Sequence, residues 1–204
     1  KTVITSKALL EKINCPVMEG MVLMEDLLKT VTTGDKLKAA LKSKLPLKSL
    51  LTRLHSGRED DTAVILFTSG SEKDPKAVQL THKNIISDIV NFSDHVGIYE
   101  TDILLANLVF FHVFGLTVNL WVAMYKGMTM VTYANPLDFQ TISKIAREEK
   151  PTIMVGTPSF FWGYLRKSEP GDFDSLRIML CGADKCPETL RDGFYEKHDI
   201  VLYE

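Results

Sequence analysis

Short runs of apolar and β-branched residues recur along the chain, and amphipathic stretches separate them. The runs that predict strands occupy residues 3–5, 21–24, 63–68, 103–108, 129–132, 152–155, 177–180 and 200–203. Among the intervening segments, residues 139–146 show helical spacing of apolar positions, with Asp138 as the expected cap. Parallel strands need crossover connections, so this alternation predicts an α/β fold with a largely parallel sheet flanked by helices.

Three further helices are expected from local signals. Two should begin near Pro158 and Pro187, because proline is favoured at the first helical position. A long, lysine-rich amphipathic helix is expected over residues 25–41, with its basic face interpreted as solvated in preference to a docking surface for an acidic partner. Residues 42–61 are rich in Lys, Ser, Pro and Gly and predict a linker between a first αβ part, 1–41, and a core, 62–204.

One stretch, residues 103–125, contains no Asp, Glu, Lys or Arg and is long enough to cross a bilayer. However, Asn107, His112 and Asn119 lie inside it, and unpaired polar side chains are costly in lipid. A buried strand followed by a buried helix is therefore favoured over a membrane span.

Composition narrows the classes of protein further. The chain has 204 residues, of which 45% are hydrophobic, so a substantial folded core is expected. Its 24 basic and 26 acidic residues nearly cancel, and a nucleic-acid partner is not expected. The cysteines, Cys15, Cys181 and Cys186, lack the paired spacing of a disulfide framework or a zinc site. No metal ligand is therefore assigned within the chain, and a reducing cytoplasm is the expected compartment.

The strand expected over residues 63–68, interpreted as buried, leads into a hydroxyl-rich loop. Its hydroxyls, backbone N–H groups and one ammonium could converge on phosphate oxygens. The residues that offer these groups are Thr68, Ser69, Gly70, Ser71 and Lys76. Pro75 rules out a Walker loop, and Phe67 rules out a Gly-x-Ser-x-Gly nucleophile elbow. The residues alone leave open an ordinary serine-rich turn with an exposed lysine.

The same loop resembles the phosphate loop of the adenylate-forming superfamily, whose usual form is Thr-Ser-Gly-Ser/Thr-Thr-Gly-x-Pro-Lys-Gly. The matching residues are Thr68, Ser69, Gly70, Ser71, Pro75 and Lys76, and Leu80-Thr81-His82 continues the pattern. Residues 72–74 and Ala77 depart from it, since two glycines are lost and carboxylates are added. The Ser71-Glu72 pair resembles the acyl-carrier-protein synthetase branch of this superfamily.

Three more segments carry the resemblance. Residues 108–115 are similar to Leu-Pro-Leu-Phe-His-x-x-Gly, with Val109 in place of proline. Residues 155–159 resemble the turn that lines the acyl tunnel, and residues 181–185 resemble the glycine-rich turn beside adenine. The resemblance implies a pocket for the acyl group and its carboxylate near His112, with Gly156 and Thr157 in the turn that lines it. Phe110, Phe111 and Trp162 are candidates for its apolar wall, and plain core packing is the alternative for these aromatic residues. The resemblance also implies adenine contacts for Gly182, Ala183 and Asp184.

The resemblance extends over most of residues 62–204, and residues 22–27 look like the bifunctional acyltransferase and acyl-carrier-protein synthetase group. The chain is thus expected to be an internal fragment of the AMP-binding N-terminal domain. The C-terminal domain and the glutamate that binds Mg²⁺ are expected further on, so the fragment by itself is expected to be inactive.

The implied reaction activates a fatty acid with ATP as an acyl-adenylate and transfers it to the phosphopantetheine thiol of acyl carrier protein, in phospholipid acyl-chain recycling. Lys76 is then expected to act as a point charge on the leaving phosphates. The alternatives are a fatty acyl-CoA ligase, in which coenzyme A is the acceptor, and a non-catalytic nucleotide-binding or scaffold domain. Membrane association, at the cytoplasmic face of the inner membrane, is expected only through parts outside this chain.

Overall fold

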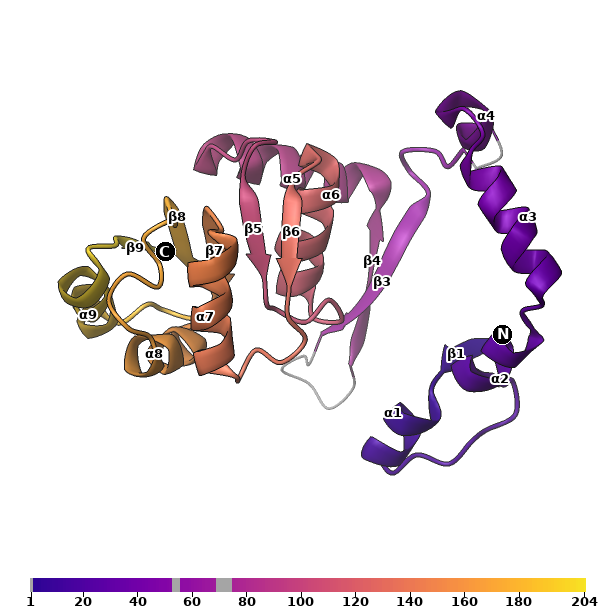
Figure 1. Cartoon of the computed structure of the whole chain (residues 1–204), viewed down its shortest axis with the longest axis horizontal. Coiled ribbons are helices and arrows are strands. Elements are labelled where there is room, and N and C mark those ends of the chain that lie inside the picture. Colours follow the sequence, from indigo (N-terminus) through magenta and orange to yellow (C-terminus); the bar gives the residue numbers. More distant parts are fainter. Residues whose placement is uncertain (1, 53–55, 69–74) are drawn as a thin grey trace. The chain divides into compact units, whose positions relative to one another are not determined.

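The structure is a computed structural model that describes residues 2–52, 56–68 and 75–204. The chain divides into two compact units, Lys1–Gly57 and Arg58–Glu204, and Figure 1 shows the elements of both. The boundary between the units falls within the segment interpreted from the sequence as a linker.

In its described residues, the first unit contains a parallel pair of short strands and four helices. Its strands pair in the register Val3 with Met21 and Thr5 with Leu23. The elements are β1 (Val3–Thr5), α1 (Lys7–Lys12), β2 (Met21–Leu23), α2 (Met24–Thr30), α3 (Thr33–Ser43) and α4 (Leu47–Leu51). None of the last three helices contains a buried residue.

The single helix expected over residues 25–41 is wrong, because the chain breaks between α2 and α3. Val31 and Thr32 are both extended there, with ψ angles of 108° and 163°. The Thr32 hydroxyl accepts the Asp35 N–H at 3.2 Å, and the Asp35 carboxylate accepts the Thr32 N–H at 3.0 Å. This capping box begins a new helix at the break.

The second unit is built on a five-stranded parallel sheet in the order β6-β5-β7-β8-β9. Its strands are β5 (Ile103–Ala106), β6 (Thr129–Thr132), β7 (Ile153–Gly156), β8 (Ile178–Cys181) and β9 (Leu202–Tyr203). Its helices are α5 (His82–Val96), the π-helix η1 (Gly115–Val122), α6 (Ala123–Lys126), α7 (Phe139–Glu149), α8 (Pro158–Lys167) and α9 (Glu188–His198). The predicted α/β fold with a parallel sheet flanked by helices is confirmed.

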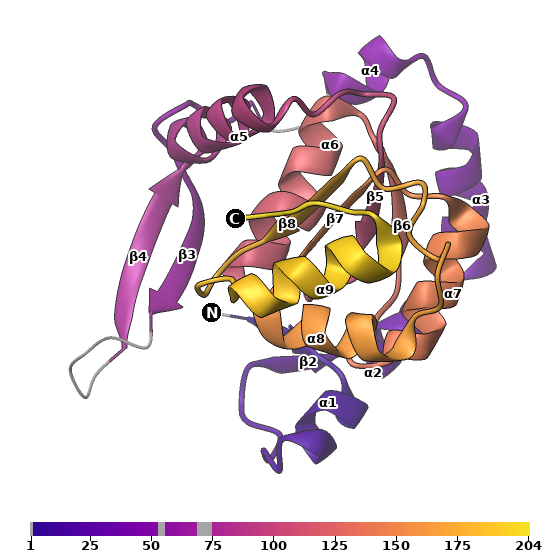
Figure 2. The same ribbon diagram turned by 90° about the vertical axis from the view of Figure 1, so that its left-hand side faces the viewer.

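Helices cover both faces of this sheet, as Figure 2 shows. Successive strand residues point to opposite faces. In β7, Met154 packs with the core of α7, α8 and α9, whereas Ile153 and Val155 pack with the core of α5, η1 and α6. Burial on both faces explains why these strands are continuous apolar runs in the sequence.

The apolar stretch over residues 103–125 supplies β5, η1 and most of α6. The prediction of a buried strand followed by a buried helix is thus confirmed, although the helix begins as a π-helix. Among the residues that the structure describes, no helix combines the length and apolar character needed to cross a membrane.

The strand expected over residues 63–68 is present as β3 (Thr62–Thr68), but its predicted burial is wrong. It pairs antiparallel with β4 (Lys76–Thr81), which was not predicted, in a separate two-stranded sheet. Ile65 and Phe67 are 53% and 72% exposed because this sheet has only two strands. The hairpin leads into α5, where Thr81 and Asn84 form a capping box.

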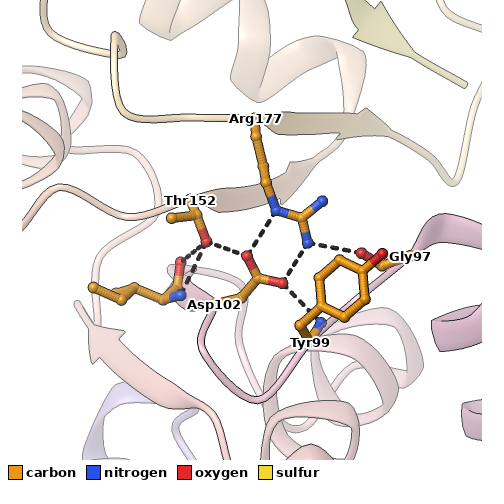
Figure 3. A network of polar contacts seen from close by, with 6 residues as sticks. Gly97, Tyr99, Asp102, Thr152 and Arg177 are labelled. Atoms are coloured by element: carbon orange, nitrogen blue, oxygen red, sulfur yellow. Dashed lines mark hydrogen bonds and ion pairs between the residues drawn. The ribbon is translucent and has the colours of Figure 1, made fainter.

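A polar network joins the amino ends of the central strands (Figure 3). The buried Asp102 carboxylate accepts hydrogen bonds from Arg177 Nε at 2.8 Å, the Thr152 hydroxyl at 2.7 Å and the Tyr99 N–H at 2.8 Å. Arg177 also donates to the Gly97 carbonyl at 2.7 Å. Burial by itself would raise the pKa of Asp102, but the Arg177 guanidinium and the other donors outweigh it and lower the pKa.

Candidate functional site

An apolar cavity of about 220 Å³ lies near the carboxyl ends of β5 and β7. Ligands of open α/β sheets bind outside these strand ends. The lining residues are Leu108, Val109, Phe111, His112, Phe114, Gly115, Pro136, Thr157 and Phe160. The structure thus brings together three residues expected at the acyl pocket, namely Phe111, His112 and Thr157. Apart from His112 and Thr157, the lining is apolar, and it suits a hydrocarbon group.

His112 is exposed at this cavity, in the loop between β5 and η1. Its Nδ1 accepts the N–H of Phe114 at 3.3 Å, and its carbonyl accepts the N–H of Leu116 at 2.8 Å. An imidazole whose Nδ1 accepts a hydrogen bond carries its proton on Nε2. The Nε2–H group is therefore a donor that an anionic headgroup in the cavity can use.

A chain of hydrogen bonds through the buried Tyr164 hydroxyl runs beside the cavity and reaches Pro136 in its wall. The Asn107 amide donates to the Tyr164 hydroxyl at 2.6 Å, and that hydroxyl donates to the Pro136 carbonyl at 3.2 Å. Asn107 directly follows β5, Pro136 follows β6, and Tyr164 lies on α8 with its side chain fully buried. Burial raises the pKa of Tyr164, so its hydroxyl stays protonated and available as a donor.

Asn119 and Gly115 fix the loop that carries His112. With its amide oxygen turned toward β5, the buried Asn119 accepts the N–H groups of Leu108 at 2.9 Å and Asn107 at 3.2 Å. A Cβ atom on Gly115 would lie 2.2 Å from the Val109 carbonyl oxygen, so only glycine allows this approach. Asn119 and Gly115 both belong to η1, and π-helical turns often occur at functional sites.

The residues expected to bind phosphate lie at the β3-β4 hairpin. Thr68 ends β3, Lys76 begins β4, and the two are register partners. Side chains of directly paired residues share a face of the sheet, which places a hydroxyl and an ammonium together. Ser69, Gly70 and Ser71 lie outside the described residues, so their expected phosphate contacts stay predictions.

The residues expected beside adenine and the acyl tunnel follow β7 and β8. The Gly182 N–H donates to the Gly156 carbonyl at 2.9 Å, and a Cβ on Gly182 would lie 3.0 Å from Phe114 of the cavity wall. Ala183 has a left-handed φ of 68°, and Asp184 accepts the N–H of the next residue at 2.8 Å. Adenine recognition by Gly182, Ala183 and Asp184 stays a prediction.

Phe110, Trp162 and Gly156, which were also expected at the pocket, do not line this cavity. Phe110 lines a neighbouring cavity of about 300 Å³, together with Asn107 and Phe111. Trp162 packs against the core formed with α7 and α9, not at the cavity, because it lies on another side of α8. Gly156 contributes no side chain to the cavity, and a Cβ there would lie 3.2 Å from Phe161.

Asn107, Asn119 and Tyr164 were not predicted as site residues. A signal for two of them was present, because Asn107 and Asn119 interrupt an otherwise apolar stretch. Such amides must find partners when buried, and here the partners are the groups that shape the cavity. Tyr164 gave no comparable signal, since a tyrosine on an apolar helix face is common in cores.

The family model of the AMP-binding enzymes, described as "AMP-binding enzyme", matches residues 1–204. The chain therefore belongs to the AMP-binding enzyme family.

Individual relatives fit this assignment. The acyl-CoA ligase SID4 of Ajellomyces capsulatus is 32% identical over 161 residues, which cover 78% of this chain and 27% of the relative. The long-chain-fatty-acid–CoA ligase of Bacillus subtilis is 29% identical over 153 residues, covering 71% and 26%. The chain thus spans about a quarter of the length of the curated relatives it matches.

Solved structures support the fold. Apo MatB from Rhodopseudomonas palustris superposes with a TM-score of 0.66 at 21% identity, over 72% of this chain and 29% of MatB. The o-succinylbenzoate CoA synthetase MenE from Bacillus subtilis, in complex with the acyl-adenylate intermediate OSB-AMP, gives a TM-score of 0.64 at 26% identity. That match covers 71% of this chain and 29% of MenE.

Proposed function

We propose that this chain supplies the acyl-binding and phosphate-binding parts of an AMP-forming acid–thiol ligase. The observation that carries the proposal is the apolar cavity at the carboxyl edge of the sheet, with His112 and Thr157 as its polar lining. An acid bound there would attack the α-phosphate of ATP, giving acyl-adenylate and pyrophosphate. A thiol would then take the acyl group and release AMP.

The residues of the chain fit distinct tasks in this reaction. The hydrocarbon part of a fatty acid suits the aromatic and aliphatic walls, while His112 Nε2–H is placed to hold its carboxylate. Thr68 and Lys76 pair a hydroxyl with a cation, which suits the phosphates of ATP. Because charge develops on the leaving pyrophosphate, a fixed ammonium stabilises the transition state more than the bound substrate. We assign no Mg²⁺ ligand to this chain.

The thiol acceptor that we propose is the phosphopantetheine of acyl carrier protein, in phospholipid acyl-chain recycling in the cytoplasm. Support for it comes from Ser71-Glu72 and residues 22–27, which resemble that branch of the family. Coenzyme A is the second candidate, and the names of the relatives, acyl-CoA ligase and long-chain-fatty-acid–CoA ligase, favour it.

The test is fatty-acid-dependent exchange of labelled pyrophosphate into ATP, measured on this chain and on the full product of its gene. We expect exchange by the full gene product and about a 100-fold to 1000-fold loss with Lys76→Ala, the range for removing one transition-state donor. Lys83→Ala is the matched control, because Lys83 is 67% exposed and lies on α5 after the hairpin. It should leave exchange unchanged.

Acceptor identity is tested separately, by following acyl transfer to purified acyl carrier protein and to coenzyme A. Exchange without transfer to either thiol would contradict the ligase proposal. Exchange by neither protein with any of several fatty acids would favour a nucleotide-binding or scaffold role. Unchanged exchange in Lys76→Ala would contradict the role given to Lys76.

A further inference from the structure

The helix α3 presents an apolar stripe that no described residue of the first unit, 2–52 and 56–57, covers. It contains no buried residue, and its two leucines, Leu37 and Leu41, are 63% and 61% exposed. At about 100° per residue, Leu37, Ala40 and Leu41 fall within an arc of about 100° on one side of the helix. The next helix, α4, adds Leu47 and Leu51, which are 69% and 53% exposed.

The same segment is strongly basic in a chain whose net charge is −2. Residues 29–48 contain a single carboxylate, Asp35, which caps α3. The basic residues are Lys29, Lys36, Lys38, Lys42, Lys44 and Lys48. On the helical projection, Lys36 and Lys38 border the apolar stripe on its two sides. Their methylene stems can lie along an apolar layer while the ammonium groups stay in a polar one.

We propose that α3 and α4 dock on an anionic lipid surface. The leucines would enter the boundary between headgroups and acyl chains, and the lysines would bind the phosphate and carboxylate groups around them. A short helix with exposed leucines on one side and lysines along its borders is the pattern of interfacial helices. Clusters of four to eight basic residues on an amphipathic helix are typical of binding to anionic lipids.

This contact would lie in the chain itself, whereas the sequence indicated a solvated basic face and membrane association only elsewhere. The helix lies on the surface in this proposal and does not span the bilayer. A nucleic acid fits the segment less well, because it would leave the leucine stripe in water. Residues 29–48 also contain no arginine and no aromatic residue, the side chains that stack on bases.

The experiment is co-sedimentation of the chain with vesicles of 70% phosphatidylcholine and 30% phosphatidylserine, compared with pure phosphatidylcholine. We expect binding to the anionic vesicles at 0.1 M NaCl, loss at 0.5 M NaCl, and little binding to the neutral vesicles. Lys36→Gln/Lys38→Gln should weaken partition about 30-fold, which corresponds to about 2 kcal/mol at about 1 kcal/mol per lysine. Leu37→Ser/Leu41→Ser should abolish binding while keeping every charge.

The matched control is Lys83→Gln/Lys144→Gln, two lysines of the second unit that are 67% and 71% exposed. It removes the same charge and should bind like the unmodified chain. Equal loss in this control would overturn the proposal, because net charge alone would then explain the binding. The proposal is also overturned if Leu37→Ser/Leu41→Ser binds normally, or if only a single-stranded oligonucleotide is bound. Each variant should fold, because none of these positions is buried. Circular dichroism checks this.

Discussion

Tyr164 donates its hydroxyl hydrogen to Pro136 and receives a hydrogen bond from the Asn107 amide, so one buried hydroxyl joins the end of β5 to α8. A hydroxyl has a single hydrogen, and this arrangement fixes which way the Asn107 amide points. Since Leu108, Pro136 and Thr157 all line the cavity, the bond holds its walls in one arrangement.

Tyr164→Phe should therefore alter the cavity more than the fold. The ring would keep its edge contacts with Phe139 and Phe161, at centroid distances of 5.2 and 6.1 Å. Loss of the hydroxyl would remove the partner of the buried Asn107 amide and of the partly buried Pro136 carbonyl, and lower the free energy of unfolding by about 1–3 kcal/mol. We expect weaker binding of a fluorescent fatty acid, together with a changed preference among chain lengths. Tyr195→Phe, at a 60% exposed position on α9, is the control. An unchanged chain-length preference would mean that the bond serves stability alone.

Gly115→Ala tests the approach of η1 to the loop that carries His112. The new methyl group would meet the Val109 carbonyl at 2.2 Å, and backbone atoms cannot rotate away as a side chain can. We expect a loss of about 1–3 kcal/mol in unfolding free energy, and weaker fatty-acid binding. Thermal and urea unfolding measure the first and fluorescence titration the second. Gly34→Ala, where the nearest atom is at 3.6 Å, should be tolerated. Normal binding by Gly115→Ala would show that the loop can shift without cost.

Asp102→Ala removes the acceptor at the centre of the network in Figure 3. The Asp102 side chain is 4% exposed, and Arg177, which is 38% exposed, would lose its buried partner. Breaking such a pair should lower the free energy of unfolding by about 3 kcal/mol, and 0.5 M NaCl should not change the difference. Asp94→Ala, which breaks a 3.5 Å pair between Lys126 and a 69% exposed aspartate, should cost less than about 1 kcal/mol. Equal losses in the two variants would contradict this account.

His198 should make stability depend on pH. Its side chain bonds the Ser168 hydroxyl at 2.8 Å among Phe173 and Phe194, and burial, followed by the charge of Lys197, lowers its pKa. The unfolded chain then binds a proton at a higher pH than the folded chain does. Stability is full above the unfolded pKa of about 6.5 and falls as pH drops toward the folded value.

His198→Gln should flatten this part of the pH profile, because glutamine does not titrate. Ser168→Ala should keep the slope while lowering stability at every pH, since the histidine stays buried. Urea unfolding at several pH values between 5 and 8 measures both. An identical slope in His198→Gln would assign the pH dependence to other groups.

The sequence was sufficient for the parallel sheet because each central strand is buried on both faces. A short apolar run such as residues 152–155, in a chain where such runs alternate with amphipathic segments, is typical of a buried parallel strand. Strand β4 was not predicted, because Lys76 and Gln79 interrupt its apolar pattern and Pro75 precedes it. The break at Thr32 was missed because the lysine-rich amphipathic pattern continues across it, although Thr32 and Asp35 have the spacing of a capping box.

At the site, motifs placed His112 and Thr157 at one cavity, but the polar groups that fix it came only from the structure. Asn107 and Asn119 belong to the same apolar stretch and Tyr164 lies on α8, and their bonds depend on how α8 and η1 pack on β5. No spacing rule contains that information.

The π-helix η1 also bears on how relatives of this chain can diverge. Its hydrogen bonds span one residue more than those of an α-helix, so deleting one of residues 116–118 would let the segment return to α-helical geometry. That change would rotate Asn119 relative to Gly115 by roughly a quarter of a turn, about 100°. A single-codon deletion could therefore change the shape of the cavity in one step, without replacing any residue that lines it.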